Sequence, residues 1–365
     1  MHKTTAWPLA LTYAALIVYA SLYPFENWRP LALAPWTYLL VPLPRYWTGF
    51  DVISNLLGYA PLGFLLALAV LRSRPQGQAV LLATLAGGAL SFLMESLQTY
   101  LPGRVASNVD LALNLAGSWL GALAAFGLEK AGAIDRWSRF RERWFVADSR
   151  GALVLLALWP MALLFPAAVP FGLGQVLERA EAGLAGWLAD TPFLQWLPVR
   201  QTELQPLLPG VEMLCVMLGA LIPCLLGYSV VRTLGHRLVF ALSALAAGLA
   251  ASGLSAALSY GPGHAWAWLT LPVQAGLVAA LVMALALLPL PRRACAALLL
   301  LALALHLSLL NNAPTGAYFA LTLQTWEQGR FIRFHGLAQW LGWLWPYVAL
   351  VYVLARVSRR EPDGP

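Results

Sequence analysis

The chain has 365 residues, of which 60% are hydrophobic and only 11% are charged, and its mean hydropathy is +0.69. Because a soluble globular domain carries about 25% charged residues, this composition excludes a single water-soluble domain and indicates an integral membrane protein. The formal net charge of +7 does not indicate nucleic-acid binding, since the basic residues lie in short segments between apolar runs and form no basic domain.

Ten segments are apolar and long enough to be membrane spans, which need about 20 residues each. They are residues 6–23, 52–71, 79–100, 109–128, 151–170, 208–231, 238–259, 266–288, 294–310 and 336–355. No segment alternates with the period of a strand, so we expect helices and not barrel strands. The predicted fold class is all-α, a polytopic helical membrane bundle with about ten transmembrane helices.

The first apolar segment follows Lys3 and also resembles a signal peptide, with Val18-Tyr19-Ala20 as a weak cleavage site. Its length favours retention as a span. Cleavage would leave the orientation of the other spans unchanged.

The distribution of basic residues predicts the orientation of the spans. Of the 23 Lys and Arg residues, 16 fall on the side of the N-terminus and 7 on the other side if ten spans alternate. Basic residues favour the cytoplasmic side of a membrane. We therefore expect both termini to be cytoplasmic.

The apolar segment between residues 51 and 121 contains an unusual set of polar side chains. Two pieces of it, beginning at Asp51 and Asp110, both read D-x-x-x-N-L-x-G. Polar residues inside membrane-spanning sequence are costly and are functional candidates by default. The candidate site consists of Asp51, Asn55, Glu95, Gln98, Arg104, Asp110 and Asn114. With the predicted topology, all seven lie near the outer face, where Arg104 could pair with the carboxylates.

Three interpretations of these residues stay open. Asp51 and Asp110 could be N-caps of their helices, but capping does not explain Asn55, Asn114 or Glu95, which lie further along. The polar side chains could instead form a structural network that ties three helices together, helped by small residues that allow close helix packing. They could also form a ligand or substrate site.

The order and spacing of these residues resemble the VanZ-like family. The matching elements are Asp51, Asn55, Pro61, Gly63, Glu95, Gln98, Pro102, Arg104, Asp110, Asn114 and Gly117, and the resemblance covers about residues 10–128. It implies a bacterial protein of the cytoplasmic membrane, in a family named for a protein associated with reduced sensitivity to the glycopeptide teicoplanin. Other members accompany envelope or exopolysaccharide genes. The resemblance implies no catalytic role for any residue.

We expect three parts along the chain. Residues 1–128 form a VanZ-like membrane domain of four spans, and residues 129–150 form a basic cytoplasmic linker that lies on anionic lipid. Residues 151–365 form a second membrane domain of about six spans. The apolar spacing near 173–190 predicts a helix on the outer membrane surface.

The second half contains another polar group on its predicted outer face. Its candidate residues are Asn312, Tyr318, Glu327, Arg330, Arg333 and His335. They form either an aromatic and basic belt at the membrane interface or a site for a sugar, peptide or phosphate, with Arg330 and Arg333 as anion contacts.

The sequence predicts no cofactor and no metal site. No His is close in sequence to the carboxylates of the first candidate site. We interpret His306 as a core residue, and the cysteines Cys215, Cys224 and Cys295 as small buried residues, since none forms a C-x-x-C pair.

Three functions are consistent with the sequence. The first is a non-catalytic envelope protein that binds a lipid-linked cell-wall or exopolysaccharide intermediate at the outer leaflet and affects glycopeptide sensitivity. The second is a membrane enzyme acting on a lipid-linked phosphate or glycan, with Glu95 or Asp110 as acid or base and Arg104 on the phosphate; no known nucleophile–base pair supports it. The third is a lipid or small-molecule transporter built on an internal repeat. Membrane lipids are the expected partners in each case, and the sequence predicts no oligomeric state.

Overall fold

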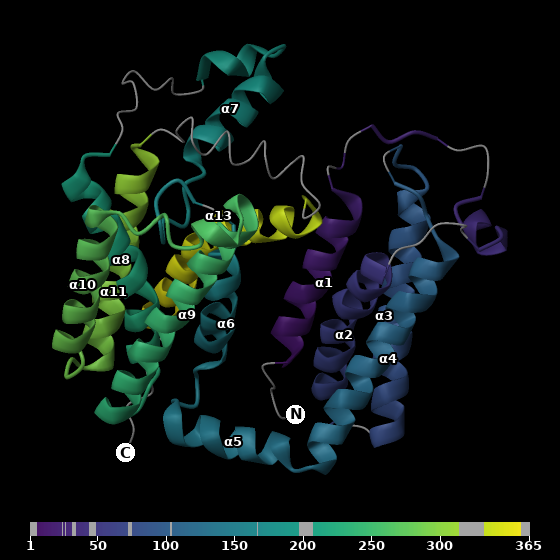
Figure 1. Ribbon diagram of the computed structural model, residues 1–365, viewed down its shortest axis with the longest axis horizontal. Coiled ribbons are helices and arrows are strands. Elements are labelled where there is room, and N and C mark those ends of the chain that lie inside the picture. Colours follow the sequence, from purple (N-terminus) through teal and green to yellow (C-terminus); the bar gives the residue numbers. More distant parts are fainter. Residues whose placement is uncertain are drawn as a thin grey trace. The chain divides into compact units, whose positions relative to one another are not determined.

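A computed structural model describes residues 6–23, 25, 27–30, 34–43, 49–71, 75–102, 104–165, 167–196, 207–313 and 332–358. Only the backbone is described for residues 50, 76, 134 and 332–338. The chain divides into two compact units, Met1–Glu142 and Arg143–Pro365 (Figure 1). Each unit is described by itself below.

The described part of the first unit is helical. Its elements are α1 (Ala6–Leu22), the short 3-10 helix η1 (Thr37–Leu40), α2 (Gly49–Val70), α3 (Gln76–Gln98) and α4 (Asn108–Lys130). Helix α5 (Ala133–Trp144) contains the boundary between the units and lies within the predicted linker, residues 129–150. The exposed rings of Trp137 and Phe140 stack on one face of α5, with their centroids 5.4 Å apart.

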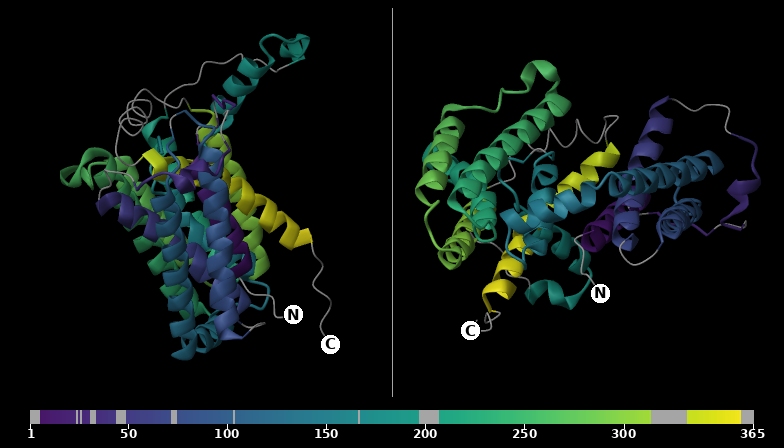
Figure 2. Two further views of the ribbon diagram at one scale, coloured as in Figure 1. Left: turned by 90° about the vertical axis from the view of Figure 1, so that its right-hand side faces the viewer. Right: turned by 90° about the horizontal axis from the view of Figure 1, so that it is seen from below.

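The second unit continues with helices. They are α6 (Arg150–Ala162), α7 (Leu177–Leu188), η2 (Pro192–Trp196), α8 (Pro209–Tyr228), α9 (Leu234–Tyr260), η3 (Pro262–His264), α10 (Leu271–Ala286), α11 (Arg292–Asn311) and α13 (Ile332–Ser358). Helix α8 packs against α9, α10 and α11, and α13 packs against α6 and α11; this arrangement can be followed in Figure 2.

The predicted fold class is confirmed. Seven helices within the described residues are long and apolar enough to cross a membrane, namely α2, α3, α4, α8, α9, α11 and α13. Three shorter apolar helices, α1, α6 and α10, fall in the remaining predicted spans. The protein is therefore a polytopic helical membrane protein.

The prediction of one span over residues 151–170 is wrong at its end. Helix α6 stops at Ala162 after 13 residues, a rise of about 20 Å, whereas the hydrocarbon layer is about 30 Å thick. Pro160 already lies in its last turn and Pro170 follows, and proline lacks the N–H that would continue the helix. Phe171 and Gly174, with φ of 63° and 94°, prevent the helix from resuming before Leu177.

The irregular segment after α6 is stabilised by side chains from other helices. The side-chain Oδ1 of Asn311 accepts hydrogen bonds from the backbone N–H groups of Val176 and Leu177, at 3.1 and 3.0 Å. Gln175 donates to the carbonyls of Leu310 and Ala313 at 3.1 and 2.9 Å. Non-helical backbone at membrane depth is tolerated only where protein groups satisfy it in this way.

The predicted surface helix near 173–190 corresponds to α7, which is shorter. The positive φ angles of Phe171 and Gly174 precede α7 and exclude helix there, so α7 starts only at Leu177. None of its residues is buried. Its placement on the outer membrane surface stays a prediction.

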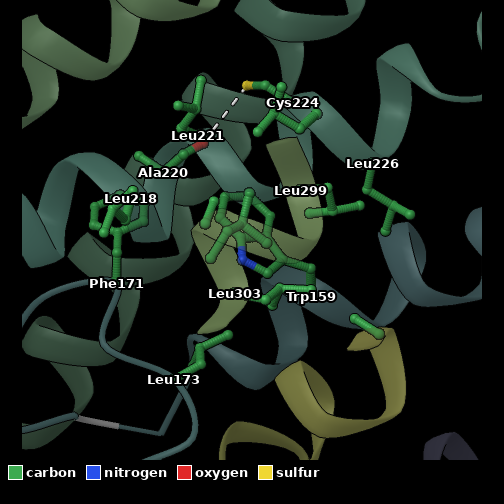
Figure 3. Close-up of a cluster of buried hydrophobic side chains, with 14 of the residues drawn as sticks. Trp159, Phe171, Leu173, Leu218, Ala220, Leu221, Cys224, Leu226, Leu299 and Leu303 are labelled. Carbon is green, nitrogen blue, oxygen red and sulfur yellow. Dashed lines mark hydrogen bonds between the residues drawn. The ribbon is translucent and has the colours of Figure 1, made fainter. Parts of the chain in front are cut away.

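The core of the second unit is aromatic and aliphatic. Trp159 and Phe171 lie with their ring centroids 6.2 Å apart, among the leucines of α8 and α11 (Figure 3). Both aromatic side chains are 2% exposed, so the irregular segment contributes directly to the core. His306 is also buried, as predicted, but its Nδ1 has no hydrogen-bond partner among the described residues.

Arg237 is a buried cation that binds backbone carbonyls in the second unit. It directly precedes the predicted span over residues 238–259, yet it lies in the first turn of α9 and is only 5% exposed. Its guanidinium donates to the carbonyls of Leu288, Leu290 and Tyr228 at 2.8, 2.6 and 2.9 Å. These carbonyls lie at or just beyond the ends of α10 and α8, where a cation is stabilised by the helix dipoles.

Helices α2 and α4 are parallel and make close backbone contact in the first unit. A Cβ atom at Gly121 would collide with the carbonyl of Ala60, and one at Gly117 would collide with the carbonyl of Leu56. On the other helix, a Cβ atom at Gly63 would collide with the carbonyl of Ser118. Small residues allow such close packing in membranes. The sequence predicts this role for Gly58, Gly63, Gly117 and Gly121, and the prediction is wrong for Gly58, where a Cβ atom would meet nothing within 4 Å.

We predict that Gly121→Ala lowers the free energy of unfolding by about 1–3 kcal/mol, the usual cost of overpacking. Gly58→Ala is the matched control, because a Cβ atom there meets nothing within 4 Å. It should be neutral or stabilising by up to about 1 kcal/mol through helix propensity. Thermal unfolding of both variants in detergent would measure the difference, and equal melting temperatures would contradict the close contact.

Candidate functional site

Four helix ends meet at one end of the first unit. The Gln98 side chain at the end of α3 donates to the Ser21 carbonyl near the end of α1, at 3.0 Å. Arg104, in the loop between α3 and α4, donates through one nitrogen to the carbonyls of Ala20 and Tyr23 at 3.1 and 2.9 Å. The last carbonyls of a helix lack partners within the helix, so Arg104 and Gln98 complete the end of α1. We call this region the polar end of the bundle.

The two D-x-x-x-N motifs make one direct contact across α2 and α4. Asn55 Nδ2 of the first motif donates to Asp110 Oδ1 of the second, at 3.0 Å. The other members are arranged differently. Asp51 lies in the first turn of α2 and is exposed, whereas Asn114 is 4% exposed and donates to Ser91 Oγ of α3 at 3.0 Å. The near-repeat in sequence is thus not a repeat in its contacts.

Glu95 is the most buried carboxylate of the candidate site, at 5% exposure. Its Oε2 accepts a hydrogen bond from the Ser107 backbone N–H at 2.8 Å. The Ser107 hydroxyl in turn accepts from the N–H groups of Val109 and Asp110 at 3.2 and 3.3 Å. Glu95 therefore fixes the start of α4 to the last turns of α3.

The N-cap interpretation of Asp110 is wrong. Ser107 is the N-cap of α4, and Asp110 lies in the first turn of the helix. A carboxylate there is still favoured by the helix dipole. The Ser107-x-x-Asp110 spacing is a capping pattern, so this signal could have identified Ser107 from the sequence.

Two further groups at the polar end were not predicted. Tyr38 of η1 and Ser96 of α3 are 6% and 8% exposed. Burial is the main cause that raises the pKa of Tyr38. The Ser96 hydroxyl, within hydrogen-bonding reach of Tyr38, lowers this pKa, and the negative charge of Glu95 raises it. No sequence signal connects Tyr38 with Glu95, because η1 and α3 are far apart along the chain.

The second candidate group is largely outside the described residues. Tyr318, Glu327 and Arg330 are not described, and for Arg333 and His335 the backbone alone is described, within α13. Asn312 follows α11 and is exposed. That group stays a prediction.

The described residues contain no group of three or more His, Cys, Asp or Glu side chains that could hold a metal ion. The three cysteines are buried and free. The contacts at the polar end are thus those of carboxylates, amides, hydroxyls and one guanidinium.

Comparison with known proteins identifies the first unit. Residues 6–129 match the family model described as VanZ/LLP1, which confirms the resemblance to the VanZ-like family. No curated protein and no solved structure matches the chain. Residues 6–129 are therefore a VanZ-like region of this membrane protein, and this region comprises α1 to α4.

We predict that Glu95→Gln retains the fold, because a glutamine oxygen can still accept the Ser107 N–H. Glu95→Leu should lower the free energy of unfolding by about 1–3 kcal/mol, the cost of leaving a buried donor without its acceptor. Thermal unfolding in detergent would compare the two variants. Equal destabilisation by both would contradict the hydrogen-bonding role of Glu95.

Proposed function

We propose that the VanZ-like domain binds the headgroup of a lipid-linked cell-wall or exopolysaccharide intermediate at the outer face of the bacterial cytoplasmic membrane. In doing so it would reduce glycopeptide access to that intermediate. The observation that carries this proposal is the convergence of polar groups from four helices at one end of α1–α4. An apolar bundle with one polar end suits an amphipathic ligand whose chain lies in the membrane.

The distribution of basic residues supports an outward orientation of the polar end. Helix α4 leads from the polar end to Lys130, and α5 follows with Arg136, Arg139, Arg141 and Arg143. Basic segments of this kind favour the cytoplasmic side. The polar end lies at the opposite end of α4, so it would face outward.

The contacts favour binding over catalysis. Glu95 accepts a backbone N–H, Asp110 accepts from Asn55, and Arg104 donates to two carbonyls of α1. A general acid or base must reach the proton that it transfers, whereas these groups are engaged in holding helix ends together. Such a fixed set of polar groups around a helix-bundle end supports preorganised recognition.

The outward orientation can be tested with single cysteines. Val105 is 87% exposed in the loop after α3, and Arg139 is exposed on α5. In cells with an intact cytoplasmic membrane, we expect an impermeant maleimide to label Val105→Cys but to label Arg139→Cys only after lysis. The native cysteines are buried and give a low background. The reverse labelling pattern would overturn the orientation.

The bound ligand can be tested by native mass spectrometry of protein purified in mild detergent. We expect the unmodified protein to retain a lipid-linked saccharide, and Glu95→Gln to retain about tenfold less, in line with loss of a charged hydrogen bond. Asp135→Asn makes the same chemical change on α5, where the side chain is exposed, and should not alter retention.

The same variants give a cellular measurement. At equal protein level, cells with the unmodified protein or Asp135→Asn should tolerate more teicoplanin than cells with Glu95→Gln. Absence of any retained lipid-linked saccharide, together with equal teicoplanin sensitivity, would refute the proposed function.

A further inference from the structure

Two buried hydroxyl groups lie close to each other at the polar end. Among the described residues, neither the Tyr38 hydroxyl nor Ser96 Oγ makes a well-aligned hydrogen bond, although their side chains are only 6% and 8% exposed. A buried hydroxyl without a well-formed hydrogen bond destabilises the fold, and such groups in a native structure call for an explanation. A bound molecule that hydrogen-bonds both of them would remove this cost.

The segment containing Tyr38 is fixed over the end of α3. Asn108 Nδ2 at the start of α4 donates to the Val41 carbonyl at 2.8 Å, and the Arg29 N–H donates to the Tyr100 carbonyl at 3.1 Å. Tyr38 is thereby brought near Glu95 and Ser96, which are adjacent on α3. The three polar side chains come from two distant parts of the chain.

The chemistry of this group favours a neutral partner rich in hydroxyls. A hydroxyl both donates and accepts, whereas a carboxylate only accepts, so the three side chains complement a ligand that offers donors and acceptors together. Phosphate offers only acceptors and would be repelled by Glu95. Arg104, the expected phosphate contact, donates to the carbonyls at the end of α1.

We propose that Tyr38, Ser96 and Glu95 bind hydroxyl groups of the sugar portion of the ligand, and not its phosphate. This inference rests on the proposed function and specifies which part of the lipid-linked saccharide is recognised. Trp36 immediately precedes η1 and is 54% exposed. Its flat ring is available to cover an apolar sugar face, since binding sites combine apolar and aromatic surface with a few placed polar groups.

The test uses two probes that differ only in the sugar. One is a polyprenyl pyrophosphate carrying N-acetylglucosamine, and the other is the same polyprenyl pyrophosphate without sugar. Their dissociation constants are measured with the full chain in nanodiscs. We expect the glycosylated probe to bind at least about tenfold more tightly, as two net hydrogen bonds would give.

Isosteric variants assign the preference to the two hydroxyls. Tyr38→Phe and Ser96→Ala each remove one hydroxyl and should each weaken binding of the glycosylated probe about fivefold, with little change for the sugar-free probe. Tyr100→Phe is the matched control, since it removes a tyrosine hydroxyl from the partly exposed turn after α3 and should leave both constants unchanged. Melting temperatures of the variants exclude misfolding as the cause.

The outcomes separate the two proposals. Equal binding of both probes overturns the sugar inference and leaves the proposed function standing. Binding of neither probe overturns both. Unchanged binding of the glycosylated probe by both Tyr38→Phe and Ser96→Ala also overturns the inference, and indicates that only water satisfies these hydroxyls.

Discussion

The polar end of the first unit depends on the close parallel contact of α2 and α4. Gly63, Gly117 and Gly121 let the two backbones approach so closely that no Cβ atom would fit. This contact brings Asn55 within 3.0 Å of Asp110. Since both helices start at the same end, their first turns meet there, and α3 packs beside both of them, with Glu95 near the start of α4. A membrane provides little hydrophobic driving force for helix association. Close packing of complementary helix surfaces therefore has to stabilise the contact between α2 and α4.

The remaining contacts follow from the need to satisfy backbone groups where water is scarce. Arg104 and Gln98 satisfy carbonyls at the end of α1, and Glu95 and Ser107 satisfy N–H groups at the start of α4. The same side chains that hold the helix ends together thus gather polar groups at one end of the bundle. Side chains also bind backbone groups in the second unit. Asn311 accepts from backbone N–H groups of the irregular segment after α6, and Gln175 of that segment donates to carbonyls at the end of α11. Arg237 donates to carbonyls at the ends of α8 and α10.

Much of the fold could be predicted from the sequence, because helix spans and small-residue packing leave strong local signals. The membrane helices, the VanZ-like domain and most of the glycine contacts could be predicted in this way. The D-x-x-x-N repeat does not predict the contacts of its residues, since neighbouring helices decide which face of each helix turns inward. The proximity of Tyr38 to Glu95 and Ser96 could not be predicted, because it depends on how the segment before α2 folds back over α3. The early end of α6 was missed because apolar residues continue beyond it into a buried irregular segment, where positive φ at Phe171 cannot be read from composition.

The central claim is that the polar end of α1–α4 is a binding site for an amphipathic envelope lipid. An experimental structure of the protein in nanodiscs made with bacterial lipid extract tests it most directly. The account predicts headgroup density beside Tyr38, Glu95 and Ser96, with a chain following the bundle surface into the membrane. A well-resolved polar end that contains water alone, with the lipid-linked saccharide bound elsewhere on the protein, would contradict it.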